Sequence, residues 1–244
     1  MSKILAIIAS FLLFAGFAEP DANLILDRVD KNMSSKNRIF YSEMIIQSRR
    51  STRTLTMLSY TEGSNQSYTE YLSPAREKGT KMLKKSNQLW IYMPSEDRII
   101  QITGQMLRQS VMGSDLSYED LMEDRKLKDM YNARVAGNDT VGSRNTYVLV
   151  LTARVEDVAY QTQKIWVDME RSVPLKQEMF AKSGQILKRT LLSEVTQIQG
   201  KWFPMRILYK DMLKEGIGTE FRFTSIKFDQ EIPEYIFSKA ALKQ

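Results

Sequence analysis

The sequence contains no histidine and no cysteine among its 244 residues. Histidine is the commonest general base and the commonest zinc ligand, and cysteine carries the most reactive thiol in proteins. Their absence excludes catalytic triads, thiol chemistry and ordinary zinc sites, and we expect neither a cofactor nor a metal ion. Without cysteine the chain has no disulfide and no residue for lipid attachment after export, so its fold must depend on core burial alone.

The sequence also lacks features that divide a chain or bind nucleic acid. No Pro/Gly/Ser-rich linker, internal repeat or low-complexity tract is present, which predicts one domain over residues 19–244. The formal net charge of +6 is a mild bias, and no basic run alternates with aromatic residues, so we expect no nucleic-acid partner. The basic pairs Arg49-Arg50 and Lys84-Lys85 fall on predicted strands, where a solvated strand face explains them.

The first eighteen residues have the order of a secretory signal peptide. A single cation at Lys3 precedes an apolar run over residues 4–17, and small residues at Gly16 and Ala18 follow the order of a cleavage site. A membrane anchor is the alternative, but the run of about fourteen residues is shorter than the roughly 20 needed to span a bilayer. We therefore predict a signal peptide over residues 1–18, cleaved after Ala18, and a protein that acts outside the cytoplasm.

The rest of the chain is mainly of strand type. Leu24, Ile25, Val29 and Met33 share one face of a predicted amphipathic helix that Asp21 can cap. From Arg38 onward apolar and polar residues alternate, which predicts about a dozen strands with short, turn-like connections. Beyond those that begin at Arg38, the expected strands cover residues 67–72, 81–85, 89–93, 98–102, 147–152, 164–169, 175–181, 186–198, 203–209 and 219–228. A sheet of that size must curl or close.

Residues 103–130 break the strand rhythm, because their apolar residues recur at helical spacing. We expect one or two helices here, lying across the sheet, and a further short helix over residues 233–242. Five methionines fall in or beside the break, namely Met93, Met106, Met112, Met122 and Met130. Flexible thioethers suit a surface that accepts apolar ligands of variable shape, although ordinary core filling explains a single methionine equally well.

Acidic residues gather in the same break. Ser117 and Asp120 have the spacing of a capping box, which places the start of a helix at Tyr118 with acidic residues in its first turn. The alternative is a pair of catalytic carboxylates, as in glycoside hydrolysis, drawn from Asp115, Glu119, Asp120, Glu123 and Asp124. Helix-end electrostatics explains the cluster without any reaction, so we do not expect an enzyme.

Several motifs together resemble one known family. They are Tyr-Leu-Ser-Pro-Ala-Arg-Glu-Lys-Gly-Thr-Lys-Met-Leu (71–83), Leu-Trp-Ile-Tyr-Met-Pro (89–94) with Arg98, Met-Gly-Ser-Asp-Leu-Ser-Tyr-Glu-Asp-Leu (112–121), Gly-Lys-Trp-Phe-Pro (200–204), and Ile232-Pro233 before Phe237-Ser238. The chain resembles the bacterial outer-membrane lipoprotein-sorting-like proteins, relatives of the carrier LolA and of the regulator RseB, in an uncharacterised branch.

The resemblance implies an α+β, mainly β, fold: a curled, incompletely closed antiparallel β-barrel with a helical lid across its concave apolar face. It implies a periplasmic carrier that shelters lipoprotein or lipid acyl chains during transfer towards the outer membrane. An inner-membrane exporter or release complex and an outer-membrane acceptor would be its partners, and the carrier would be a monomer. An RseB-like lipid-sensing regulatory module is the alternative. A strand arginine helps to hold the lid in the classical carrier; Arg76 and Arg98 are possible counterparts, but no motif aligns either with it.

Trp90 and Tyr92 share one face of a predicted strand, opposite Leu89, Ile91 and Met93. Aromatic residues side by side on a strand usually belong to the core, but they can also line a hollow. The candidate ligand-binding residues of the lid and cavity are Trp90, Tyr92, Met106, Leu107, Val111, Met112, Leu116, Leu121 and Met122.

Overall fold

The computed structural model describes residues 20–48 and 51–244. The predicted signal peptide and its cleavage site after Ala18, and the pair Arg49-Arg50, lie outside the described residues. Within the described part, no helix is both long enough and apolar enough to cross a membrane.

One curled antiparallel sheet of 13 strands forms the body of the molecule. The strands are β1 Asn37–Gln47, β2 Thr52–Glu62, β3 Gln66–Ser73, β4 Lys81–Lys85, β5 Gln88–Met93, β6 Arg98–Ile102, β7 Tyr131–Val141, β8 Arg144–Ala153, β9 Thr162–Asp168, β10 Pro174–Phe180, β11 Ile186–Ile198, β12 Lys201–Asp211 and β13 Gly218–Phe228. Their order is β6-β5-β4-β3-β2-β1-β13-β12-β11-β10-β9-β8-β7. The sheet is therefore two meanders joined where β1 pairs with β13, and its outer strands β6 and β7 remain unpaired with each other, as expected for an incompletely closed barrel.

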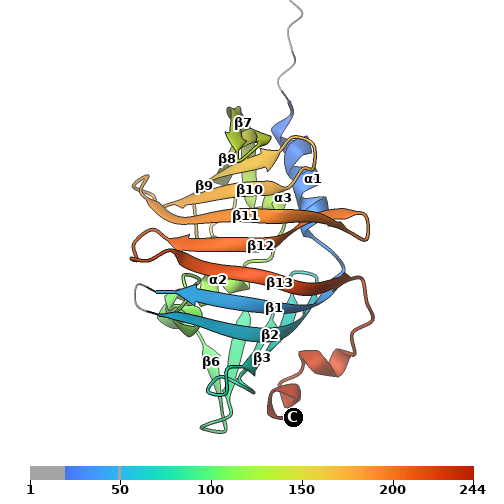
Figure 1. Cartoon of the computed structure of the whole chain (residues 1–244), viewed down its shortest axis with the longest axis vertical. Helices are drawn as coiled ribbons and strands as arrows, with labels where there is room; N and C mark the ends of the chain where they lie inside the picture. The colour runs from blue at the N-terminus through green and yellow to red at the C-terminus, as the bar shows by residue number, and fades with distance from the viewer. Residues whose placement is uncertain (1–19, 49–50) are drawn as a thin grey trace, which may run out of the picture.

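Helix α1 (Ala22–Met33) lies on the concave side of the sheet, behind the strands in Figure 1. Asp21 caps it as predicted, since its carboxylate accepts hydrogen bonds from the backbone N–H groups of Asn23 and Leu24. The apolar face of α1 packs on β7, β8 and β9, and burial of this face contributes most of the stabilisation of such a helix. The buried cluster is Ala22, Ile25, Leu26, Val29, Met130, Tyr131, Leu149, Leu151, Ile165 and Val167.

Residues 103–130, which we call the lid segment, connect the edge strand β6 to the edge strand β7. The expectation of one or two helices here needs correction in number and length. The segment folds as four short pieces: η1 (Gly104–Arg108), η2 (Val111–Gly113), α2 (Tyr118–Met122) and α3 (Leu127–Met130). Met112 and Gly113 have φ of 50° and 77°, a left-handed turn that a continuous helix cannot contain.

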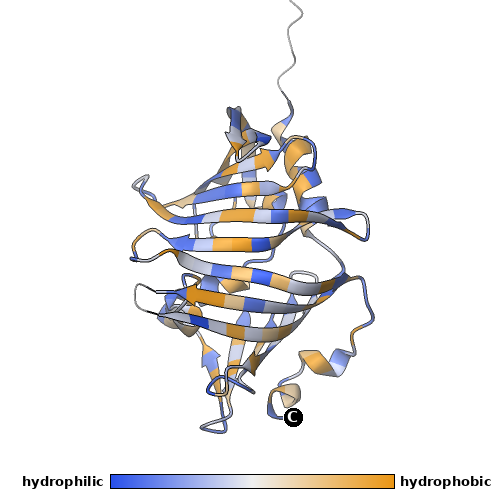
Figure 2. Cartoon of the chain, in the orientation of Figure 1, coloured by the Kyte–Doolittle hydropathy of each residue, from blue (hydrophilic) through white to orange (hydrophobic). Residues whose placement is uncertain are grey.

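Two other expectations need correction. The predicted strands do not include β7, because it is an exposed edge strand with little hydrophobic alternation and a register shift between Val135 and Gly137. The C-terminal segment forms two 3₁₀ turns, η3 (Glu234–Phe237) and η4 (Ala240–Lys243), instead of one helix. Figure 2 shows the hydrophobic and hydrophilic bands that alternate along the strands and made most of the other strands predictable.

Candidate functional site

Two cavities adjoin on the concave side of the sheet, both bordered by the lid segment. The first, called here the apolar cavity, has a volume of about 250 Å³ and lies between β1–β5, β12, β13 and the lid segment. Its apolar lining residues are Phe40, Met44, Met57, Tyr71, Met82, Leu89, Val111, Leu116, Leu121, Met122, Tyr209, Phe221 and Phe223. The strand residues among them alternate with residues on the opposite face, so the alternation itself lines the hollow.

The second cavity, called here the polar cavity, has a volume of about 1000 Å³. It lies between the end of α1, the second half of the lid segment and strands β9–β12, and its walls mix charged, polar and apolar side chains. The two cavities share the lining residues Arg38, Asp120, Glu123, Asp124 and Tyr209. Ligand sites commonly enclose 300–1000 Å³, so the pair together has room for a ligand with two chemically different parts.

Seven of the nine candidate residues gather at the apolar cavity. Val111, Leu116, Leu121 and Met122 line it. Met106, Leu107 and Met112 pack against the hydrophobic cluster beside this cavity. Its buried members are Met44, Ile46, Leu55, Met57, Tyr71, Met82, Leu89, Ile91 and Ile102. The lid methionines therefore meet strand methionines across the hollow, which gives it a flexible, polarisable lining.

Trp90 and Tyr92 lie on the opposite, convex face of β5 and line neither cavity. Trp90 is buried against Leu83, Phe237 and Leu242, so the C-terminal turns cover it. The Lys239 ammonium lies 4.2 Å from the centre of the Trp90 ring. It is the alternate residues Leu89 and Ile91 that face the concave side.

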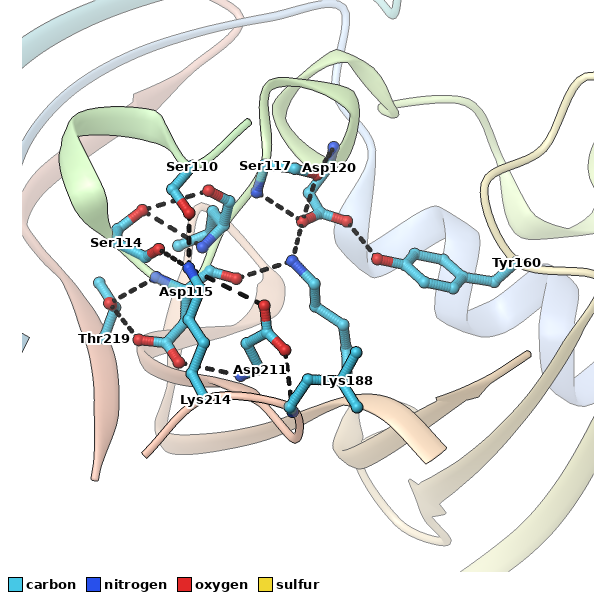
Figure 3. Close-up of polar contacts among 12 residues, drawn as sticks. Ser110, Ser114, Asp115, Ser117, Asp120, Tyr160, Lys188, Asp211, Lys214 and Thr219 are labelled. Atoms are coloured by element: carbon cyan, nitrogen blue, oxygen red, sulfur yellow. Dashed lines mark hydrogen bonds and ion pairs between the residues drawn. The ribbon is translucent and has the colours of Figure 1, made fainter. Parts of the chain in front are cut away.

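Polar contacts from the strands hold the lid segment in place (Figure 3). The Lys188 ammonium, on β11, donates to the Asp120 carboxylate at 2.6 Å and to the backbone carbonyl of Asp115 at 2.7 Å. Asp120 also accepts from the backbone N–H and the hydroxyl of Ser117, each at 2.7 Å, and from the Tyr160 hydroxyl at 2.7 Å. The predicted capping box is thus present, and its acid has a second function as the anchor for Lys188.

Electrostatics keeps the contact between Lys188 and Asp120, called here the lid junction, ionised. Burial alone would raise the pKa of Asp120, but the charge and hydrogen bond of Lys188, with the bonds from Ser117 and Tyr160, hold that pKa below its usual value. Burial beside the Asp120 carboxylate raises the pKa of Tyr160, so its hydroxyl keeps its proton and donates. The lid junction is therefore an ion pair with neutral donors around it at neutral pH.

Asp115 fastens the first half of the lid segment to the turn between β12 and β13. Its carboxylate accepts from the backbone N–H of Asp211 at 3.0 Å and from the Thr219 hydroxyl at 2.8 Å. In the same turn, Lys214 donates to the backbone carbonyl of Ser114 at 2.8 Å. Figure 3 shows these residues converging from the lid segment and the two strands.

Three further strand cations bind the lid segment. Arg53 on β2 donates to the Met112 carbonyl and pairs with Glu77 at 3.2 Å. Lys84 on β4 donates to the Met122 carbonyl at 2.6 Å; it is buried, which corrects the expectation of a solvated strand face, and burial lowers its pKa.

Arg38 on β1 binds both carboxylate oxygens of Asp124, at 2.8 and 3.0 Å. The resemblance suggested Arg98 and Arg76. Arg98, at the start of β6, pairs with Glu96, and neither arginine forms a hydrogen bond or ion pair with the lid segment within the described part of the chain.

The acidic cluster acts as a set of fasteners. Four of its five members have partners, since Asp115, Asp120 and Asp124 bind as described and Glu123 pairs with Arg125 at 2.6 Å. These carboxylates are therefore engaged in ion pairs and hydrogen bonds that hold the lid segment in its present position. Over residues 20–48 and 51–244, no group of three or more Asp or Glu side chains is placed to hold a metal ion.

The chain is similar to several solved structures. It has 22% identity and a TM-score of 0.79 with an outer membrane lipoprotein-sorting protein domain from Vibrio parahaemolyticus, covering 91% of this chain and 98% of that one. A DUF1329 family protein from Desulfovibrio piger gives 22% identity, a TM-score of 0.82, and coverage of 90% and 97%. A LolA superfamily protein from Nitrosomonas europaea gives 25% identity, a TM-score of 0.72, and coverage of 90% and 98%. These proteins share the fold of this chain.

One family model, described as that of an uncharacterised protein, matches residues 63–244. No curated protein matches the chain. The matched range begins in the turn before β3 and includes the whole lid segment and every later strand.

Proposed function

Because the chain belongs to the uncharacterised family whose model matches residues 63–244 and has the fold of LolA superfamily proteins, we propose that it is a periplasmic carrier. It shelters the acyl chains of a lipoprotein or lipid in its apolar cavity during transfer towards the outer membrane. It binds and releases its cargo without catalysing a reaction.

The observation that carries this proposal is the apolar cavity closed by the lid segment. Apolar and aromatic side chains from both the sheet and the lid make up 13 of its 23 lining residues, and the other ten are polar or charged. Each methylene group of an acyl chain moved from water into such a site gains about 0.8 kcal/mol. The part of an acyl chain that enters this cavity would therefore gain binding free energy from its apolar walls.

The way the lid segment is fastened supports a carrier that opens. Lys188, Arg53 and Lys84 reach it through hydrogen bonds and ion pairs. Each such bond to a charged group is worth about 1.5–3 kcal/mol, and none of them belongs to the backbone pairing of the strands. The lid segment can therefore leave the cavity with the sheet still paired, at a cost that grows with the number of these bonds.

Export through the N-terminal signal would place this carrier in the aqueous space between two membranes. An inner-membrane exporter or release complex would load it, and an outer-membrane acceptor would unload it. A monomer suffices for both steps, because the cavity and its lid belong to one chain.

Native mass spectrometry of the protein purified from periplasm tests the proposal, with a co-purified lipid or lipoprotein as the expected result. Two variants sharpen it. Leu121 lines the apolar cavity and is 39% exposed, whereas Leu191 is 40% exposed on the outer face of β11 and lines neither cavity. Leu121→Arg should weaken binding of a fluorescent acyl probe about tenfold or more, since burying a leucine is worth about 1.5–3 kcal/mol, and Leu191→Arg should leave it unchanged.

A protein that is reproducibly empty and binds no acyl probe would refute the carrier proposal. Equal loss of binding in the two variants would show that the probe binds elsewhere on the surface.

A further inference from the structure

A row of uncharged polar side chains crosses the floor of the polar cavity. Gln177 on β10 pairs directly with Thr190 on β11, and Thr190 pairs directly with Tyr209 on β12. Residues paired in this way lie on the same face of a sheet, with neighbouring side chains about 5 Å apart. All three line the polar cavity, and Tyr209 also lines the apolar cavity.

The hydroxyl groups of this row have unused hydrogen-bonding capacity. Thr190 is 5% exposed, and its hydroxyl has no hydrogen-bond partner among the described residues. The Tyr209 hydroxyl has none in that part of the chain either, and burial raises its pKa, so it stays a neutral donor. Gln177 uses its amide nitrogen to donate to Gln163 and keeps its carbonyl oxygen available. Buried polar groups are normally hydrogen-bonded, so the unpaired hydroxyl of the buried Thr190 points to a polar partner in the cavity.

Three ion pairs lie around the cavity, whereas Lys36, Glu119, Lys126 and Asp129 also line it and form no ion pair among the described residues. Lys188 binds Asp120, Arg38 binds Asp124, and Arg125 binds Glu123. A phosphate or carboxylate bound at the row itself would have to break the Lys188–Asp120 pair to gain Lys188, the cation two residues before Thr190 on β11. The row itself offers only neutral hydroxyl and amide groups, which suit a headgroup that is rich in hydroxyls and carries no charge.

We propose that the two cavities bind the two ends of one amphiphile, an acyl chain in the apolar cavity and an uncharged, hydroxyl-rich headgroup on the Gln177–Thr190–Tyr209 row. Tyr209 lies where the cavities meet, so it contacts the junction between chain and headgroup. This inference rests on the proposed function and names the cargo class: a neutral lipid such as a glycolipid or an acylglycerol.

Competition between a fluorescent acyl probe and dodecyl compounds that differ only in headgroup tests the inference. The competitors are dodecyl glucoside, dodecanoylglycerol, dodecanoate and dodecylphosphocholine, each below its micelle concentration. Dodecyl glucoside or dodecanoylglycerol should compete better than the two charged compounds by roughly 5- to 150-fold, the range expected for two neutral hydrogen bonds. Which of the two neutral compounds binds more tightly distinguishes a sugar from a glycerol headgroup.

The variants Thr190→Val and Tyr209→Phe remove the hydroxyls and keep the shapes. Together they should abolish the preference for neutral headgroups and leave the affinity for dodecanoate within about twofold. They should also fold, because removing a hydroxyl that lacks a protein partner loses no internal hydrogen bond. Thr196→Val, exposed on the same strand, and Tyr41→Phe, 48% exposed on the convex face, are the matched controls and should change nothing.

Equal binding of all four compounds, or a preference for either charged one, would overturn this inference while leaving the carrier proposal intact. The inference also fails if the double variant still prefers neutral headgroups, because the Gln177–Thr190–Tyr209 row then does not determine which headgroup binds. If none of the four displaces the probe, both proposals fail.

Discussion

Replacing Lys188 by methionine should loosen the lid segment while the sheet stays folded. The Lys188 ammonium makes two short bonds to the lid, at 2.6 Å to the Asp120 carboxylate and 2.7 Å to the Asp115 carbonyl. The Lys188 and Asp120 side chains are 15% and 14% exposed, so water replaces these bonds poorly. Hydrogen bonds to charged groups are worth about 1.5–3 kcal/mol. Asp120 keeps its bonds from Ser117 and Tyr160, so we expect a loss of about 2–3 kcal/mol in the free energy of lid opening.

Hydrogen exchange measured by mass spectrometry reports this quantity directly. The lid amides of Val111, Ser114 and Tyr118 are bonded to other lid carbonyls, and they should exchange roughly 30- to 150-fold faster in the variant. Amides of β8 and β9 should keep their wild-type rates. The double variant Lys188→Met with Asp120→Asn should recover part of the protection, because it removes the unpaired buried charge. Lid exchange that is unchanged, or acceleration spread evenly over the sheet, would refute the reasoning.

The same ion pair predicts the effect of acid on the lid. The pKa of Asp120 in the folded protein lies below its ordinary value of 3.8. A lowered acid pKa contributes stability that is complete well above pH 3.8 and is lost as the pH falls through the lowered value. Lid exchange, corrected for its intrinsic pH dependence, should therefore stay constant from neutral pH down to about pH 5 and rise only below pH 3.8. A lid that opens between pH 5 and 7 would contradict this assignment.

Two other variants separate the faces of the sheet. Arg53→Met removes the bond to the Met112 carbonyl and leaves the buried Glu77 without its cation. The variant should therefore bind the acyl probe faster in stopped-flow experiments, and urea titration should show a free energy of unfolding lower by about 1–3 kcal/mol. Slower association would count against Arg53 as a lid contact. The Phe237 ring is 1% exposed and covers Trp90. Phe237→Ala should lower the free energy of unfolding by about 3–5 kcal/mol and shift tryptophan emission to the red, without changing the affinity for the acyl probe. A lower affinity would instead place Trp90 in the ligand site.

The local features of the fold were predictable from the sequence because neighbouring residues determine them. Asp21 caps α1, and Ser117 with Asp120 forms the capping box, because both signals lie within three residues of their partners. Strand alternation likewise located β8 to β13. It could not decide which side of β5 faces the hollow, since Leu89 and Trp90 are both buried and only the position of the C-terminal turns distinguishes the two faces.

The fasteners of the lid could not be predicted. Lys188 is 68 residues from Asp120, and Arg53 is 59 residues from Met112, so no short spacing connects them. A lone cation on a strand usually means a solvated face, as we expected of Lys84. The headgroup row was missed for the same reason, because Gln177, Thr190 and Tyr209 become neighbours only when three strands pair. The one sequence feature that could have indicated this row is the alternation of β11, which places the uncharged Thr190 on the inner face of the sheet.

The lid segment is a strap rather than a door, because its two ends continue into β6 and β7, the opposite edges of the sheet. A strap anchored at both ends cannot swing on one hinge. It can only bow outwards, and the slack for bowing must come from unwinding its own short helical turns, since an extended residue spans about 3.3–3.6 Å against 1.5–2 Å in a helix. Each of the four short helical pieces can unwind separately and add a small length of extended chain. Opening by this route would widen the gap at the sides of the lid segment, and rewinding its turns would draw the two edges of the sheet, β6 and β7, closer together.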